Sequence, residues 1–264
     1  GSAPAYPHGV VDPIPELAAL AKSHSLPLHV DACVGGFSLP FVRKAGYPVP
    51  PFDFSVPGVT SMSADLHKYG FAAKGASTVL YRTPELRRHQ FYVYSGWPGG
   101  LFGSATVLGT RPGGAIAAAW ASLNALGEAG FLRIASTIMN TTRILLDGIA
   151  SIAGLVILGK PDCGVFAYGS VGPDLMAIAD QMEERGWHID RQQFPTSIHL
   201  TITPAHAPIA ERYLADLRDA VAHVTAHPEL SSEGTAAMYG MLMHIPDPSM
   251  VEDFILSNFD ALYR

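Results

Sequence analysis

The sequence predicts an α/β protein with a larger domain over residues 1–150 and a smaller α/β domain over residues 151–264. Three observations lead to this prediction. A short apolar segment ends in Asp31, as a buried strand of an open α/β sheet does. Two strand patterns flank a polar turn that carries Lys68. After Gly154, short apolar runs alternate with amphipathic helical patterns, which is typical of a separate small α/β domain.

The first domain is expected to alternate helices and strands. Asp12 is the expected N-cap of its first helix, and Gly35-Gly36 is expected to form a turn after the strand that ends at Asp31. A proline-rich, irregular connection follows through Pro57. The expected elements are a helix over about 12–24, a strand over 26–31, a strand beginning at 60, a strand over 76–81 and a short helix over 84–88.

The rest of the chain divides at a glycine-rich stretch. Residues 96–113 contain six glycines and two prolines, so no regular structure is expected there. A long apolar helix is predicted over about 115–152, with a break near 127–130. The elements expected beyond it are strands over 155–158, 165–168, 187–189 and 198–202, and helices over 174–184 and 209–223.

Composition limits the classes of function. Hydrophobic residues make up 48% of the chain and charged residues 15%, which suggests extensive subunit contact and a homodimer. A net charge of −6 without a basic stripe gives no reason to expect nucleic acid as a partner. Two irregularly spaced cysteines, Cys33 and Cys163, fit a reducing compartment. The expected location is the cytoplasm, with secretion as a bacterial effector left open, and no transmembrane segment is expected.

The chemistry is expected at Lys68 and Asp31, which are 37 residues apart in the chain, enough for one excursion between neighbouring strands. A lysine that forms a Schiff base must be positioned and at least partly deprotonated, and burial near other cations lowers the pKa of its amine. An aspartate at a pyridinium nitrogen and an imine-forming lysine are the two groups that pyridoxal phosphate requires of a protein. The alternatives without catalytic function are that Lys68 is a solvated loop lysine and that Asp31 is a turn aspartate.

Two other readings stay open. His29-x-Asp31 and Asp65-x-His67 each place two metal-binding side chains on one face of a strand, which would suit a metal-dependent hydrolase. That reading leaves Lys68 unexplained, and we expect no metal. The other reading is a non-catalytic chain that retains the fold.

Several motifs together resemble one family. They are His29-Val30-Asp31-Ala32, Gly35-Gly36-Phe37, Ser63-Ala64-Asp65-Leu66-His67-Lys68-Tyr69-Gly70, Lys74-Gly75, Leu86-Arg87-Arg88-His89-Gln90, Gly99-Gly100-Leu101-Phe102-Gly103-Ser104 and Gly109-Thr110-Arg111-Pro112-Gly113. The sequence resembles the sphingosine-1-phosphate lyases, fold-type I pyridoxal-phosphate enzymes related to the group II decarboxylases. The likeness is dense in the first half of the chain and loose in the second.

For the cofactor, the resemblance implies pyridoxal 5'-phosphate bound by Asp31, His67, Lys68 and Thr110. Lys68 and Asp31 would be the catalytic residues, and His67 would contact the cofactor phosphate. Thr110 stands where the family usually has serine, and would act across a dimer interface. Residues 1–150 would form the C-terminal part of the large cofactor-binding domain.

For the substrate, the resemblance implies a phosphorylated sphingoid base such as sphingosine 1-phosphate, whose phosphate Tyr6 and Lys74 would bind. Retro-aldol cleavage between C2 and C3 would yield a fatty aldehyde and phosphoethanolamine. An amino-acid decarboxylase of the same fold is the alternative. The resemblance also implies a C-terminal fragment of a bacterial-type enzyme, with the N-terminal half missing or present as a separate chain.

Overall fold

The structure is a computed structural model that describes residues 1–243 and 248–263, and it falls into two compact units. The first unit comprises residues 1–143, 159–166 and 201–207, and the second comprises residues 144–158, 167–200 and 208–264. Segments of the chain therefore interleave between the units. The predicted domains, 1–150 and 151–264, are a division along the sequence and stay a prediction.

The first unit contains a three-stranded sheet in the order β1-β2-β3. Its strands are β1 (Leu28–Asp31), β2 (Val59–Ala64) and β3 (Thr78–Tyr81). β1 runs parallel to β2, and β3 is antiparallel to β2, with Asp31 opposite Ser63. Because β1 and β2 are parallel, Asp31 and the turn after β2 lie at the same edge of the sheet. The three predicted strands are confirmed.

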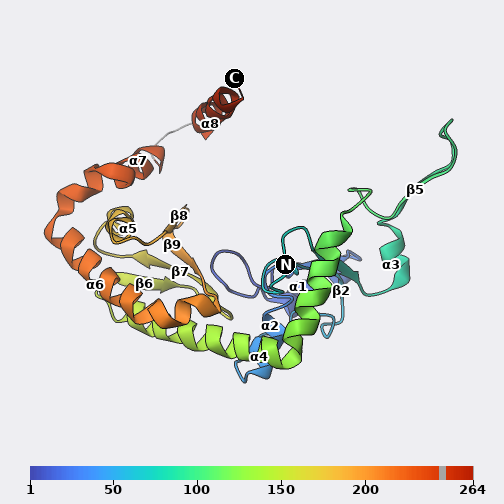
Figure 1. Cartoon of the computed structure of the whole chain (residues 1–264), viewed down its shortest axis with the longest axis horizontal. Coiled ribbons are helices and arrows are strands. Elements are labelled where there is room, and N and C mark those ends of the chain that lie inside the picture. Colours follow the sequence, from blue (N-terminus) through green and yellow to red (C-terminus); the bar gives the residue numbers. More distant parts are fainter. Residues whose placement is uncertain (244–247, 264) are drawn as a thin grey trace. The chain divides into compact units, whose positions relative to one another are not determined.

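Three short helices accompany this sheet: α1 (Ile14–Ser23), α2 (Leu39–Lys44) and α3 (Pro84–Arg88) (Figure 1). The predicted cap of α1 is wrong, since Pro13 is the N-cap residue and no side chain caps the helix. The Asp12 carboxylate instead accepts a hydrogen bond from the backbone N–H of Ser2, at 2.7 Å. This contact ties the start of the chain to the segment before α1.

A two-stranded antiparallel ribbon, β4 (Tyr92–Tyr94) and β5 (Phe102–Ser104), follows α3. The prediction that residues 96–113 lack regular structure is therefore wrong for β5. Gly100 adopts a φ of 115° in the turn between the strands, a conformation that glycine adopts without strain. Gly103 pairs with Val93. Gly100 and Gly103 therefore lie within the β4-β5 hairpin.

The long helix α4 (Gly113–Ala150) contains the predicted break, because Gly127 has a φ of 56° and a ψ of −178°. Among the described residues, α4 is the one helix long and apolar enough to cross a membrane by length and composition. This is weak evidence, because core helices of globular proteins meet the same criterion.

The second unit is built around a four-stranded sheet in the order β6-β7-β9-β8. Its strands are β6 (Leu155–Leu158), β7 (Val165–Ser170), β8 (Asp190–Gln193) and β9 (Thr196–Thr201). Helices α5 (Leu175–Glu184) and α6 (Ala210–Ala226) pack against each other beside it (Figure 1). The remaining elements are η1 (Pro204–Ile209), η2 (Pro228–Ser232), α7 (Gly234–Met243) and α8 (Pro248–Leu262).

The strand predicted over 187–189 is wrong, since the strand begins at Asp190. Trp187 has a strong β propensity, but its ring meets Tyr213 edge-on at 5.1 Å between centroids. Its indole N–H also donates a hydrogen bond to Asp216, at 2.8 Å. Packing against α6 thus takes Trp187 out of the sheet.

Candidate active site

A pocket of about 550 Å³ lies within the first unit. Its wall combines polar groups from the start of the chain and from the turn after β2 with apolar side chains. The lining residues are Tyr6, Cys33, Val34, Lys68, Tyr69, Phe71, Val165, Thr201 and Thr203. Lys68 therefore lies at the wall of a mostly apolar pocket.

Asp31 is the last residue of β1, two positions before the pocket-lining Cys33. Its Oδ1 atom accepts hydrogen bonds from the backbone N–H of Cys33, at 2.9 Å, and from the hydroxyl of Ser63, at 2.8 Å. Burial opposes ionisation, but these hydrogen bonds outweigh it and lower the pKa of Asp31 below its ordinary value. The carboxylate is therefore ionised at neutral pH.

Close backbone packing supports this strand end. A Cβ atom placed on Gly35 would lie 2.0 Å from the carbonyl oxygen of Ala3, and one on Gly36 would lie 2.5 Å from Cβ of Ala64. Only glycine fits such close approaches without a backbone shift. The Gly35-Gly36 turn therefore lets the chain pass close to both segments beside Asp31.

The turn that carries Lys68 is anchored on both sides. Its backbone N–H at His67 donates to the carbonyl of Ala76, at 3.1 Å. Leu66 is buried against Ala76 and Ala119, the latter in α4. The buried hydroxyl of Tyr69 donates to the carbonyl of Ile202, at 2.9 Å. A turn held in this way fixes the backbone from which the lysine extends.

The amine of Lys68 lies beside a carboxylate. Its Nζ atom lies 3.0 Å from Oδ2 of Asp65. Burial favours the neutral amine, but hydrogen bonds to Cys33 and Asp65 outweigh it and raise the pKa of Lys68 above its ordinary value. The expectation of a lowered lysine pKa is therefore wrong for this arrangement, in which Lys68 is an ammonium at neutral pH.

Asp65, which in the sequence stands out only as half of a possible metal-binding pair, contacts Lys68 in the structure. It is 9% exposed, and its Oδ1 atom accepts a hydrogen bond from the hydroxyl of Ser77. The spacing Asp65-x-x-Lys68 places both residues on one turn, which is the pattern in the sequence that could have revealed the contact. The partnership with Ser77 depends on the strand that follows the turn.

Of the other predicted site residues, one lines the pocket and three do not. Tyr6 lines it, and its side chain is exposed. Nδ1 of His67 donates a hydrogen bond to the carbonyl oxygen of Ala76, at 2.7 Å, which fixes the orientation of the imidazole ring. Lys74 and Thr110 are exposed, and neither is among the described residues that line the pocket.

The two metal-binding pairs are occupied by other partners. His29 Nδ1 lies 2.8 Å from the hydroxyl of Ser61, and Asp65 is bonded to Ser77 and Lys68. In the part of the chain that the structure describes, no group of three histidine, cysteine or acidic side chains is placed to hold a metal ion. No observation favours the hydrolase reading.

The residues present fit pyridoxal phosphate. Lys68 offers an amine at the pocket wall for the aldehyde, and Asp31 offers a carboxylate that its hydrogen bonds keep ionised, as a protonated ring nitrogen requires. Both groups come from the edge of one sheet, where ligands bind in open α/β folds.

The comparisons agree with this chemistry. The sequence model of the pyridoxal-dependent decarboxylase conserved domain matches residues 7–169. The chain therefore belongs to the pyridoxal-dependent decarboxylase family. This confirms the fold class predicted from the resemblance and pyridoxal phosphate as the cofactor.

Within that family, the similarity is to sphingosine-1-phosphate lyases, which confirms the predicted resemblance. The chain is 49% identical to the enzyme of that name from Arabidopsis thaliana, over 100% of this chain and 48% of that protein. A solved sphingosine-1-phosphate lyase from Burkholderia pseudomallei is 39% identical, with a TM-score of 0.83 over 94% of this chain and 56% of that one. A Lactobacillus brevis glutamate decarboxylase shares the fold, with a TM-score of 0.71 at 19% identity over 85% of this chain and 54% of that one. The chain spans about half the length of these relatives.

Proposed function

We propose that this chain is part of a pyridoxal-phosphate-dependent lyase that cleaves a phosphorylated long-chain base such as sphingosine 1-phosphate. The products would be a fatty aldehyde and phosphoethanolamine. One observation carries the proposal: Lys68 at the pocket and an ionised Asp31 at the same sheet edge, in a chain similar to sphingosine-1-phosphate lyases along its whole length.

Bound pyridoxal phosphate would supply an aldehyde that takes the substrate amine and a ring that accepts electrons when the C2–C3 bond breaks. Asp31 would hold the proton on the ring nitrogen. Lys68 would hold the cofactor before substrate arrives and would receive it back after product leaves. His67 and Thr110 would bind the cofactor, with Thr110 acting from the partner copy of a homodimer.

The substrate phosphate would be bound by Tyr6 and Lys74. A tyrosine hydroxyl donates one hydrogen bond to a phosphate oxygen, and a lysine acts as a point charge. Tyr6 lines the pocket, which supports its part of this proposal. The apolar wall formed by Val34, Phe71 and Val165 suits the carbon chain of such a substrate.

A homodimer is proposed for the whole protein. The β4-β5 ribbon and the segment after it expose large apolar side chains, among them Val93 at 76%, Leu101 at 87% and Leu108 at 78% exposed. Large apolar side chains exposed in such number on one segment are typical of an interface. A cytoplasmic location is also proposed. Light scattering of the purified protein and cell fractionation test the two statements.

The direct test is product analysis with purified protein supplied with pyridoxal phosphate. Phosphorylated sphingosine should yield a long-chain aldehyde and phosphoethanolamine, and Lys68→Ala should yield neither. The alternative is an amino-acid decarboxylase, which the family description favours. Release of carbon dioxide from an amino acid, at a higher rate than cleavage of the phosphorylated base, would support that alternative and refute the lyase.

A further inference from the structure

Asp65 occupies a place that the proposed chemistry leaves unexplained. It is a buried carboxylate at the end of β2, directly after Ala64, and it lies behind the amine of Lys68. The hydroxyl of Ser77, just before β3, donates to its Oδ1 atom, while its Oδ2 atom faces Lys68 at 3.0 Å. Each carboxylate oxygen thus has a different partner, and the two partners fix the plane of the group.

Few other groups near Lys68 could pair with its ammonium as Asp65 does. His67 also approaches Oδ2 of Asp65, at 3.7 Å. Cys33 hydrogen bonds to Lys68, and Asp31 acts on it through its charge. Among the described residues, the titratable groups that interact with the amine are Asp65, Cys33 and Asp31. Tyr6 and Tyr69 line the same pocket. Of the two carboxylates, Asp31 accepts the hydrogen bonds from Cys33 and Ser63 at its Oδ1 atom.

We propose that Asp65 is a positioning residue for Lys68: it holds the free ammonium at the pocket wall whenever the lysine is not bonded to a cofactor. This inference rests on the proposed function for its place in the catalytic cycle. The contact between the two side chains is a property of the chain itself. Ser77 supports it by fixing the carboxylate, and Lys68 therefore stays beside the pocket when it is displaced.

Under this proposal the two carboxylates have different roles, which one carboxylate could not combine. Asp31 would contact the ring nitrogen of the cofactor, whereas Asp65 neutralises the charge of the Lys68 ammonium. The pKa of Lys68 is raised because its hydrogen bonds to Cys33 and to Asp65 together outweigh burial. Because the Lys68 side chain is 38% exposed, the solvent screens this pair in part.

The test is competitive labelling of the intact protein with trace acetic anhydride, followed by mass spectrometry of the Lys68 peptide across a range of pH. Only the neutral amine reacts, so the labelling rate reports its protonation. In Asp65→Asn we expect Lys68 to label about two- to fivefold faster at pH 8, the size expected of a partly exposed ion pair. Asp65→Glu, which keeps the charge, should label close to the wild-type rate.

Asp53→Asn is the matched control, because the Asp53 carboxylate likewise accepts a hydrogen bond, from the backbone N–H of Ser55 at 2.8 Å, and pairs with a cation, Arg43 at 3.6 Å. It should leave the labelling of Lys68 unchanged. Equal labelling in wild type and folded Asp65→Asn would overturn the proposal, as would an equal rise in Asp53→Asn. Circular dichroism checks the fold of each variant.

A second measurement needs no variant. A carbodiimide activates a carboxylate, an amine in contact with it then displaces the urea formed from the carbodiimide, and an amide results, so wild type should give an Asp65–Lys68 link in its mass spectrum. A link from Lys68 to Asp31 instead, or no link to either, would overturn the proposal. Neither experiment uses cofactor or substrate. A protein without lyase activity that still shows the shift would therefore refute the function and leave the positioning role standing.

Discussion

Replacing Asp31 by Asn tests the cofactor side of the account without removing the fold. An asparagine Oδ1 can still accept the hydrogen bonds from Cys33 and Ser63 that the aspartate accepts now. The free energy of unfolding at pH 7 should therefore fall by no more than about 1 kcal/mol. The substitution does, however, remove the negative charge that the Asp31 carboxylate would place at the ring nitrogen of the cofactor.

Turnover should fall much further than stability. A hydrogen bond to a charged group contributes about 1.5–3 kcal/mol, so losing it should slow cleavage of the phosphorylated base by about one to two powers of ten. The assay compares kcat/KM for wild type, Asp31→Asn and the control Asp53→Asn, with thermal unfolding of each. Asp31→Asn turnover within threefold of wild type, in a folded protein loaded with cofactor, would refute the role of Asp31.

The same variant has a predictable pH dependence of stability. The folded-state pKa of Asp31 is lowered, so its ionisation stabilises the fold above the unfolded pKa of about 3.9 and stops doing so as pH falls through the folded value. The stability difference between wild type and Asp31→Asn should therefore shrink between pH 7 and pH 3, as measured by denaturant unfolding. A difference that grows on acidification would contradict the lowered pKa.

The remaining predictions concern other contacts. Lys74→Ala should lose most of the preference for phosphorylated over unphosphorylated sphingosine, about one to two powers of ten in kcat/KM, and an unchanged preference would make Lys74 a surface lysine. Tyr69→Phe should lower the free energy of unfolding by about 1–2 kcal/mol, because it leaves a buried carbonyl without its donor; a denaturation midpoint equal to wild type would contradict this. Arg191→Ala should cost about 2–3 kcal/mol at pH 7, because its side chain is 6% exposed and paired with Asp180 and Glu183. Arg191 lowers the pKa of Glu183, so that cost should shrink below about pH 4, and a constant cost from pH 7 to pH 3 would count against the pair.

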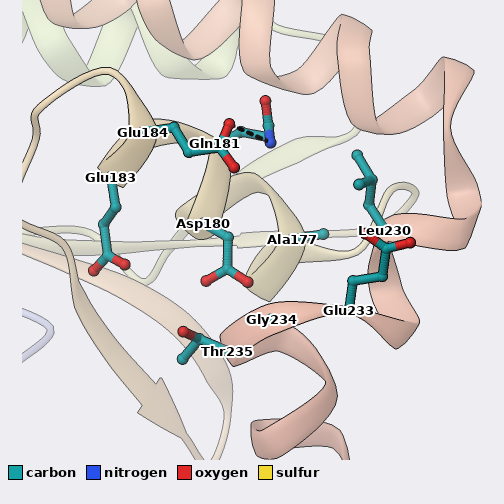
Figure 2. Close-up of a pocket in the computed structure, with 9 residues that line it drawn as sticks. All are labelled: Ala177, Asp180, Gln181, Glu183, Glu184, Leu230, Glu233, Gly234 and Thr235. Carbon is teal, nitrogen blue, oxygen red and sulfur yellow. Dashed lines mark hydrogen bonds between the residues drawn. The ribbon is translucent and has the colours of Figure 1, made fainter.

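Arg191 lies on β8, and its partners Asp180 and Glu183 line an acidic pocket of the second unit. Figure 2 shows Asp180, Glu183 and Glu184 on α5, with Glu184 beside Gln181 and with Thr235 at the start of α7 near Asp180. The arginine neutralises part of this charge, and Asp180 also accepts a hydrogen bond from the backbone of Ala236 in α7, at 2.9 Å. Asp180 and Glu183 therefore stabilise the packing of the second unit.

Local patterns in the sequence predicted the parts of the fold that local forces determine. The apolar run ending in Asp31, the turn at Lys68 and the break at Gly127 follow from strand patterning and glycine conformations. The strand expected at Trp187 was wrong because a contact with Tyr213, distant in sequence, outweighs β propensity.

The site was predicted to a similar extent. The catalytic pair could be proposed from residue type and spacing, because the chemistry of pyridoxal phosphate demands an amine and a carboxylate. Neither the raised pKa of Lys68 nor the hydrogen bond from Ser77 to Asp65 could be predicted in this way. Both depend on side chains that only the folded turn and the strand after it bring together.

The central claim is that Lys68 carries pyridoxal phosphate. The most direct measurement is borohydride reduction of the protein with bound cofactor, followed by digestion and mass spectrometry. The account predicts a reduced pyridoxal-phosphate adduct on the peptide containing Lys68 and loss of that adduct in Lys68→Ala. An adduct on Lys74 or another lysine, with Lys68 unmodified, would contradict it.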